Sequence, residues 1–266
     1  MKTRIISAAV LVPLVVIGIV LGGVVWQVLA VIVGALAIFE MARALRNAEI
    51  KPMVILDLLY LLASGACIWA GSMHLVFAVL LVFLMIAGTV SMLLPNKGIK
   101  DAIATVFVMV SPTSFVLVLA LVEQFGWVYI VAGILASVVT DTAAYFIGKQ
   151  FGKKKLCPNI SPNKTVIGAL AGAFGCFVLL SVFGILCEVF IHGSIGAVKT
   201  LGWLVLALLC GVFAQLGDLF ASSIKRFCGV KDFSSLIPGH GGVVDRLDSV
   251  MFTCVLVYLF RLLGII

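Results

Sequence analysis

Residues 166–191 read VIGALAGAFGCFVLLSVFGILCEVFI, and Glu188 is the single charged side chain in this run. A helix of about 20 mostly apolar residues spans the hydrocarbon core of a bilayer, so the run predicts a transmembrane helix. Comparable runs recur along the chain, whose mean hydropathy is +1.31. We predict an all-α, polytopic integral membrane protein of about nine transmembrane helices, near 4–22, 24–42, 53–71, 75–94, 102–122, 127–149, 166–191, 200–225 and 245–264.

Positive charge follows the order of these helices. Of the 18 Lys and Arg residues, 16 lie at the N-terminus or in every second connection between the predicted helices. The exceptions are Lys199 and Arg261. Cytoplasmic segments carry this excess in membrane proteins, so the N-terminus and these connections are predicted to be cytoplasmic. The formal charge of +7 is then mainly a topology signal, which leaves no reason to expect a nucleic-acid partner. We expect the protein to lie in the cytoplasmic membrane of a bacterium, with its active site on the cytoplasmic face.

The distribution of polar motifs divides the chain into two regions. Residues 1–122 are predicted to be a scaffold of transmembrane helices, and 123–266 a catalytic transmembrane region with cytoplasmic loops 150–165 and 227–244. In the scaffold, Glu40 and Asp57 flank a basic connection. We expect both to pair at the membrane interface with a cation of that connection, Arg43, Arg46 or Lys51.

The most polar stretch, 217–248, reads GDLFASSIKRFCGVKDFSSLIPGHGGVVDRLD and holds four of the 11 acidic residues. Asp218, Ser222 and Lys225 share one helix face, because they are spaced i, i+4, i+7. A carboxylate and a hydroxyl suit a hard cation, and Lys225 with Arg226 suits phosphate oxygens. The alternative is a self-neutralising Asp–Lys pair at the end of the helix.

The end of this stretch combines glycines with two more acids. Gly241 and Gly242 have no Cβ and let backbone amides approach an anion, just before a helix N-terminus that favours phosphate. Asp245 and Asp248, three residues apart, would repel unless a divalent cation lies between them. The alternative is that these acids pair with neighbouring cations. We predict metal ligation by Asp218, Asp245 and Asp248.

A second polar stretch ends the predicted sixth helix. Asp141, Tyr145 and Lys149 share one helix face, and an ionised aspartate inside a membrane span needs a hydrated cavity or a cation. The basic connection that follows has the composition of an ordered loop whose lysines bind phosphate. For Lys153, Lys154 and Lys155 a plain topological anchor is an equal alternative.

These residues resemble a family. The motifs are Ser222-Ser223-Ile224-Lys225-Arg226, Lys231-Asp232, Pro238-Gly239-His240-Gly241-Gly242 and Asp245-Arg246-Leu247-Asp248, with Asp141-Thr142-Ala143-Ala144-Tyr145 and Ser161-Pro162-Asn163-Lys164-Thr165 upstream. Together they are similar to the signature of the phosphatidate cytidylyltransferase, or CDP-diacylglycerol synthase, family. The chain departs from that family at Asn163, where a lysine is usual, and at Ile167, where a glutamate is usual.

The resemblance implies transfer of CMP from CTP to phosphatidic acid within the lipid bilayer, with Mg²⁺ and room for a second cation. On the motifs and the resemblance together, we expect a direct part in catalysis from Asp218, Lys225, Arg226, Asp245 and Asp248. We expect substrate binding by Asp141, Lys149, Lys153, Ser161, Lys164, Ser222, Lys231, His240, Gly241, Gly242 and Arg246.

Three other functions stay open on the sequence. A transporter also carries intramembrane acids, but it predicts them near mid-membrane with a path to both faces. A CTP-dependent polyprenol or phytol kinase would use a similar metal site with an alcohol acceptor. A non-catalytic scaffold leaves the acidic residues unexplained. The sequence does not reveal the oligomeric state, and a homodimer stays open.

Overall fold

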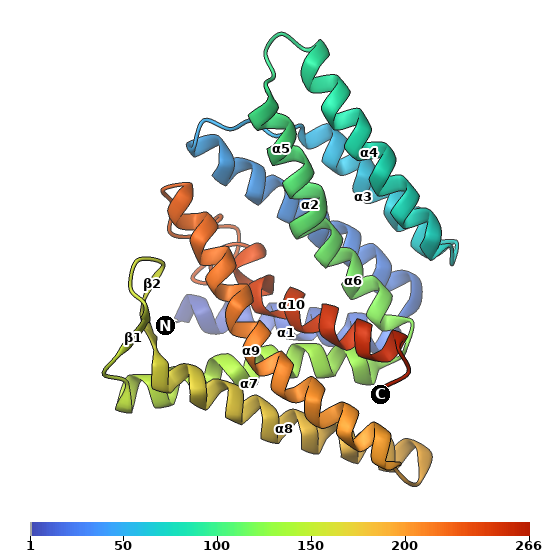
Figure 1. Cartoon of the computed structure of the whole chain (residues 1–266), viewed down its shortest axis with the longest axis vertical. Helices are drawn as coiled ribbons and strands as arrows, with labels where there is room; N and C mark the ends of the chain where they lie inside the picture. Colours follow the sequence, from blue (N-terminus) through green and yellow to red (C-terminus); the bar gives the residue numbers. More distant parts are fainter. Residues whose placement is uncertain (1) are drawn as a thin grey trace. The chain divides into compact units, whose positions relative to one another are not determined.

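A computed structural model of the chain describes residues 2–266 (Figure 1). The described helices are α1 (Lys2–Leu21), α2 (Gly23–Asn47), α3 (Val54–Trp69), α4 (Met73–Leu93), α5 (Ile99–Val108), α6 (Ser114–Glu123), α7 (Trp127–Phe151), α8 (Val166–His192), α9 (Ala197–Phe227) and α10 (Val244–Leu262). A π-helical turn, Met109–Thr113, joins α5 and α6 into one rod. The all-α prediction is confirmed, and each predicted span coincides with a helix or with this rod.

Six helical stretches among the described residues are long and apolar enough to cross a bilayer: α2, α4, the α5–α6 rod, α7, α8 and α9. Shorter apolar helices cover Ala9–Leu21 and Val54–Trp69. The chain is therefore a polytopic membrane protein. The ninth predicted span, α10, falls outside this set because Asp245, Arg246 and Asp248 fill its first turns.

The break in the α5–α6 rod has a local cause. Pro112 has no backbone N–H and cannot donate to the carbonyl of Val108, one turn earlier. The Thr113 hydroxyl donates to that carbonyl instead at 2.9 Å, and the Ser114 hydroxyl donates to Met109 O at 2.9 Å. The irregularity at Pro112 is thus a π-turn whose free carbonyls are satisfied by neighbouring hydroxyls.

The loop predicted at 150–165 contains a small sheet. Strand β1 (Lys155–Cys157) pairs antiparallel with β2 (Ser161–Thr165), with Lys155 opposite Thr165 and Cys157 opposite Ser161. Thr165 then caps α8, because its hydroxyl accepts a hydrogen bond from Gly168 N at 3.2 Å. The hairpin therefore leads directly into a membrane helix.

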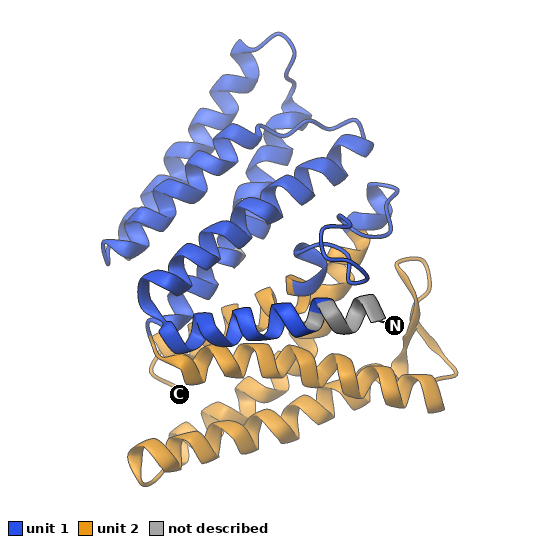
Figure 2. Cartoon of the chain, turned by 180° about the vertical axis from the view of Figure 1, so that it is seen from behind, with its two compact units in different colours: residues 1–124, 224–246 blue, residues 125–223, 247–266 orange. Residues whose placement is uncertain are grey.

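The chain divides into two compact units, drawn in separate colours in Figure 2. Unit 1 comprises residues 1–124 and 224–246, and unit 2 comprises 125–223 and 247–266. Unit 2 begins at residue 125, and the segment 224–246 clusters with the N-terminal helices. Both α9 and α10 therefore contribute residues to each unit.

Asp57, in the first turn of α3, differs from its prediction. We expected it to pair at the interface with a cation, but it is fully buried and neither carboxylate oxygen has a hydrogen-bond partner among the described residues. Its burial in the first turn of α3 keeps it from the exposed cations of the 43–51 connection. Asp57 is therefore an interior residue of unit 1.

Candidate active site

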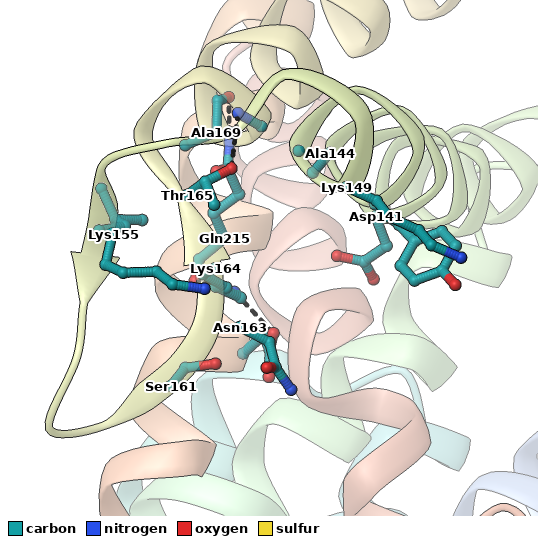
Figure 3. A pocket seen from close by; sticks show the side chains of 16 residues that line it. Asp141, Ala144, Lys149, Lys155, Ser161, Asn163, Lys164, Thr165, Ala169 and Gln215 are labelled. Atoms are coloured by element: carbon teal, nitrogen blue, oxygen red, sulfur yellow. Dashed lines mark hydrogen bonds and ion pairs between the residues drawn. The ribbon is translucent and has the colours of Figure 1, made fainter.

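A cavity of about 640 Å³ lies in unit 2 (Figure 3). Its chemically distinctive lining comes from three elements: Asp141, Tyr145 and Lys149 of α7, Lys155, Ser161, Asn163 and Lys164 of the hairpin, and Gln215 and Asp218 of α9. We call Asp141, Lys149, Ser161, Lys164 and Asp218 the cavity cluster. All five were predicted as site residues, and the structure brings them to one cavity.

One ion pair joins the hairpin to α9. Lys164 Nζ lies 2.6 Å from Asp218 Oδ2, and the two side chains are 21% and 28% exposed. The Ser222 hydroxyl donates to Asp218 Oδ1 at 3.3 Å, from one turn further along α9. Because the pair is partly exposed at the cavity, a ligand can exchange with either partner at modest cost.

A glycine cradle holds the hairpin in position. A Cβ on Gly148, Gly152 or Gly168 would lie closer than 3.0 Å to the Thr165 hydroxyl oxygen. These glycines therefore allow the end of α7, the hairpin and the start of α8 to approach closely around Thr165. Lys164 is the residue before Thr165, so the cradle also fixes where the Lys164 side chain begins.

Helices α9 and α10 approach closely within unit 2. A Cβ on Gly217 would collide with the backbone carbonyl of Asp248 and with the Phe252 ring. Asp248 thus lies across from the residue preceding Asp218. One of its oxygens, Oδ1, accepts a hydrogen bond from Ser249 N at 2.7 Å.

A second set of polar residues lies in unit 1, and we call Glu40, Lys225, His240, Gly242 and Asp245 the loop cluster. Lys225 Nζ lies 2.7 Å from Asp245 Oδ1, with side chains only 11% and 2% exposed. Asp245 Oδ2 accepts hydrogen bonds from Phe233 N and Gly242 N, both at 2.9 Å. Both oxygens of this buried carboxylate are therefore engaged by protein donors.

The glycine-rich loop is ordered by its own backbone. Ile237 O accepts hydrogen bonds from His240 N at 2.9 Å and Gly241 N at 3.1 Å, and Gly239 and Gly241 have φ of 76° and 85°. Such angles favour glycine. We expected the Gly241 and Gly242 amides to face phosphate, but they donate to Ile237 and Asp245. His240 Nδ1 is buried and has no hydrogen-bond partner in the described part of the chain.

Glu40 was the main site residue that we misread. Over the described residues, Glu40 forms no ion pair with Arg43, Arg46 or Lys51, although we expected one. Its carboxylate instead accepts three hydrogen bonds from the 234–244 segment. The local sequence gave no sign of this, because those donors lie about 200 residues further along the chain.

The remaining predicted residues separate by unit. Unit 2 also holds Lys153, Ser222 and Asp248, whereas unit 1 also holds Arg226, Lys231, Gly241 and Arg246. Lys153, Arg226, Lys231 and Arg246 are all exposed. Sequence reasoning missed Gln215, which lines the cavity and donates to Ala169 O at 3.0 Å. Its spacing of i, i+3 from Asp218 was the available signal.

The cavity cluster fits a magnesium ion. Over residues 2–266, no group of three or more His, Cys, Asp or Glu side chains is placed to hold a metal. Mg²⁺ is commonly held, however, by one or two protein carboxylates together with substrate phosphates and waters. Asp141 and Asp218 line the same cavity and supply such a pair. Asp245 fits less readily, because an ion would have to displace Lys225.

Known proteins resemble this chain over about half of its length. The phosphatidate cytidylyltransferase of Bacillus subtilis is 40% identical over 143 residues, which cover 54% of this chain and 50% of that protein. Those of Staphylococcus aureus (strain COL) and Brucella suis are each 42% identical, over 127 and 138 residues. The chain spans about half the length of the curated relatives it matches.

A family model covers far more of the chain than these alignments do. The model of the cytidylyltransferase family matches residues 2–263, which include both units and every residue of the cavity and loop clusters. The chain therefore belongs to the cytidylyltransferase family.

Proposed function

We propose that this chain is a phosphatidate cytidylyltransferase, which transfers CMP from CTP to phosphatidic acid and releases pyrophosphate. The cavity cluster carries the proposal. It combines two carboxylates with lysines at the ends of membrane helices, where a lipid headgroup and a soluble polyanion can both bind. Similarity to proteins named phosphatidate cytidylyltransferase supports the same substrates.

In the proposed reaction, a phosphate oxygen of phosphatidic acid attacks the α-phosphorus of CTP. The bond from that phosphorus to the β-phosphate bridging oxygen breaks, and pyrophosphate leaves. Such displacements depend on alignment and on neutralising charge. A phosphate monoester is largely ionised near neutral pH, so the reaction needs no dedicated protein base.

The cavity residues have distinct proposed roles. Asp218, with Asp141, would hold Mg²⁺, which would neutralise phosphate charge when bound. Lys149 and Lys164 bind phosphate oxygens, and Ser161 donates a hydrogen bond to them. Lys164 also holds the Asp218 carboxylate until substrate arrives, since the two are paired at 2.6 Å.

The loop cluster and its exposed cations have further proposed roles. Asp245 and Asp248 stay candidates for the metal or for a second cation. Lys225 positions Asp245, to which it is paired at 2.7 Å. The exposed cations Arg226, Lys231 and Arg246 would attract CTP or the lipid phosphate.

Position-specific labelling of CTP tests the reaction directly. Purified protein in detergent micelles is given phosphatidic acid or a polyprenol, with CTP labelled at either the α- or the γ-phosphorus. Cytidylyl transfer labels phosphatidic acid from α-labelled CTP only, and the label is lost when Mg²⁺ is chelated. Label transferred from γ-labelled CTP to polyprenol would select a lipid kinase. Absence of transfer to either lipid, with solute flux in vesicles, would select a transporter.

We also propose that the N-terminus and the active site face the cytoplasm of a bacterial cell, as the Lys and Arg distribution indicates. The relatives named above are bacterial. A membrane-impermeant maleimide tests this with Lys154→Cys in the hairpin region and Gly196→Cys between α8 and α9, each compared with the unmodified chain. In intact cells, Gly196→Cys should be labelled and Lys154→Cys protected; the reverse pattern contradicts the orientation.

A further inference from the structure

The carboxylate of Glu40 is surrounded by hydrogen-bond donors from the 234–244 segment, which is distant in sequence. Glu40 belongs to α2, is 5% exposed, and lies in unit 1 together with residues 224–246. Its Oε1 accepts hydrogen bonds from the Ser234 hydroxyl at 2.6 Å and from Val243 N at 2.8 Å, and its Oε2 accepts from Val244 N at 2.9 Å. A buried carboxylate with three donors is strongly held.

Two of these donors are at the start of α10. Val244 is its first residue, and the first amides of a helix have no acceptor within the helix. Glu40 satisfies such amides from another helix, and its charge is favourable at that helix end. The α10 N-terminus that we expected to hold phosphate is thus capped by a protein carboxylate.

Gly242 makes this approach possible. A Cβ on Gly242 would lie 2.5 Å from Glu40 Oε2 and 2.7 Å from Glu40 Oε1. The carboxylate cannot easily move away, because the hydrogen bonds from Ser234, Val243 and Val244 hold it. The Gly242 amide itself donates to Asp245 Oδ2, and the next amide, that of Val243, donates to Glu40. Glu40 and Asp245 therefore bind adjacent residues of one short segment.

We propose that Glu40 is a positioning residue, which fixes the 234–244 segment and, through it, the Asp245–Lys225 pair. Glu40 makes no contact with the substrates in this role. The inference rests on the proposed function only where it concerns turnover. The tether itself is a property of the fold and can be measured without any substrate.

Hydrogen exchange measures the tether. Glu40→Gln replaces one of the two acceptor oxygens with an NH₂ donor, so the amide of either Val243 or Val244 loses its acceptor and faces a donor instead. Peptides covering 233–246 should exchange at least about tenfold faster, while peptides from α3 and α8 keep their rates. Glu49→Gln is the matched control, because it removes the same charge from an exposed residue just after α2. Unchanged exchange at 233–246 in Glu40→Gln would overturn the proposal.

Kinetics then separate positioning from binding. In the CMP-transfer assay, Glu40→Gln should lower kcat by about 10- to 100-fold and change the KM for CTP by less than about threefold, since it misplaces groups rather than removing a substrate contact. Glu40→Asp should recover part of kcat. Fast exchange with unchanged kcat would refute the catalytic link. If the wild-type chain transfers no CMP, the proposed function fails, whereas the exchange result still decides the tether.

A double-mutant cycle gives a test that survives poor folding of one variant. Gly242→Ala alone should speed exchange at 233–246, because its methyl group displaces the Glu40 carboxylate. In a Glu40→Ala background the same change should alter exchange by less than about twofold, because nothing remains to displace. Equal effects of Gly242→Ala in both backgrounds would contradict the proposed contact.

Discussion

The cavity cluster and the loop cluster use the same residue types in opposite ways. In the cavity cluster, the Lys164–Asp218 pair is about a quarter exposed and faces a space of about 640 Å³. In the loop cluster, the Lys225–Asp245 pair is almost fully buried, and every oxygen of Asp245 and Glu40 already has a donor.

This difference separates binding from support. An exposed pair beside a cavity can exchange its partner for a phosphate or a metal ion, because water compensates for the change. A buried pair cannot do so cheaply, because losing one partner leaves a desolvated charge. We therefore expect changes in the cavity cluster to affect activity most, and changes in the loop cluster to affect stability as well.

The largest expected effect is on activity, from Asp218→Asn. The amide keeps an acceptor for Ser222 but loses the charge that a metal requires, so turnover should fall by several hundred-fold or more with little change in stability. The measurement is CMP transfer by purified protein, and Glu49→Gln, at an exposed acid just after α2 and outside every motif, should stay within about twofold. Wild-type turnover in Asp218→Asn would remove this residue from the metal site.

Stability should respond most to Lys225→Met. Removing one partner of the buried pair leaves Asp245 charged and uncompensated, which should lower the free energy of unfolding by about 3–5 kcal/mol. Loss of helicity on titration with SDS measures this. Adding Asp245→Asn should recover about half of the loss or more, because the stranded charge is then gone. A double variant no more stable than Lys225→Met would show that the pair is not the source of the loss.

A smaller effect on activity is expected from Lys164→Met. It removes a cation from the cavity and should lower kcat/KM for CTP by about 10- to 100-fold, as for loss of one charged contact to phosphate. The control is Lys154→Met, which removes the same charge from a residue just before β1 that does not line the cavity. It should change kcat/KM by less than about threefold. Equal losses in the two variants would indicate general attraction of CTP rather than a specific contact.

The smallest expected effect is from Thr165→Val, which keeps the shape of the side chain but removes the cap of α8. The free energy of unfolding should fall by about 1 kcal/mol, and Thr165→Ser should restore most of it. Thr200→Val, at a half-buried position near the start of α9, should cost less than about 0.5 kcal/mol. If Thr165→Val is as stable as the wild-type chain, the hairpin is held by packing alone.

Features governed by neighbours in sequence were predictable. Apolar runs located the helices, since hydropathy and length determine whether a segment can span a bilayer. The i, i+4, i+7 spacing placed Asp218, Ser222 and Lys225 on one face of α9. The proline in the α5–α6 rod and the polar face of α7 were likewise local properties, and the structure places Asp141 and Lys149 in a cavity as that face suggested.

Partner choice between distant segments was not predictable. From the sequence, we predicted that Glu40 pairs with nearby cations, whereas its hydrogen-bond donors are Ser234, Val243 and Val244. The sequence also offered the Gly241 and Gly242 amides to phosphate, whereas these amides donate to Ile237 O and Asp245 Oδ2.

By itself, the sequence determined an all-α membrane protein and the residue types of its polar stretches. The tertiary structure alone decided which carboxylates face a cavity and which are buried on backbone donors. The physical reason is that a carboxylate accepts equally well from a lysine, an amide or a hydroxyl, so the packing of segments that are distant in sequence, about 200 residues apart for Glu40, selects the donor.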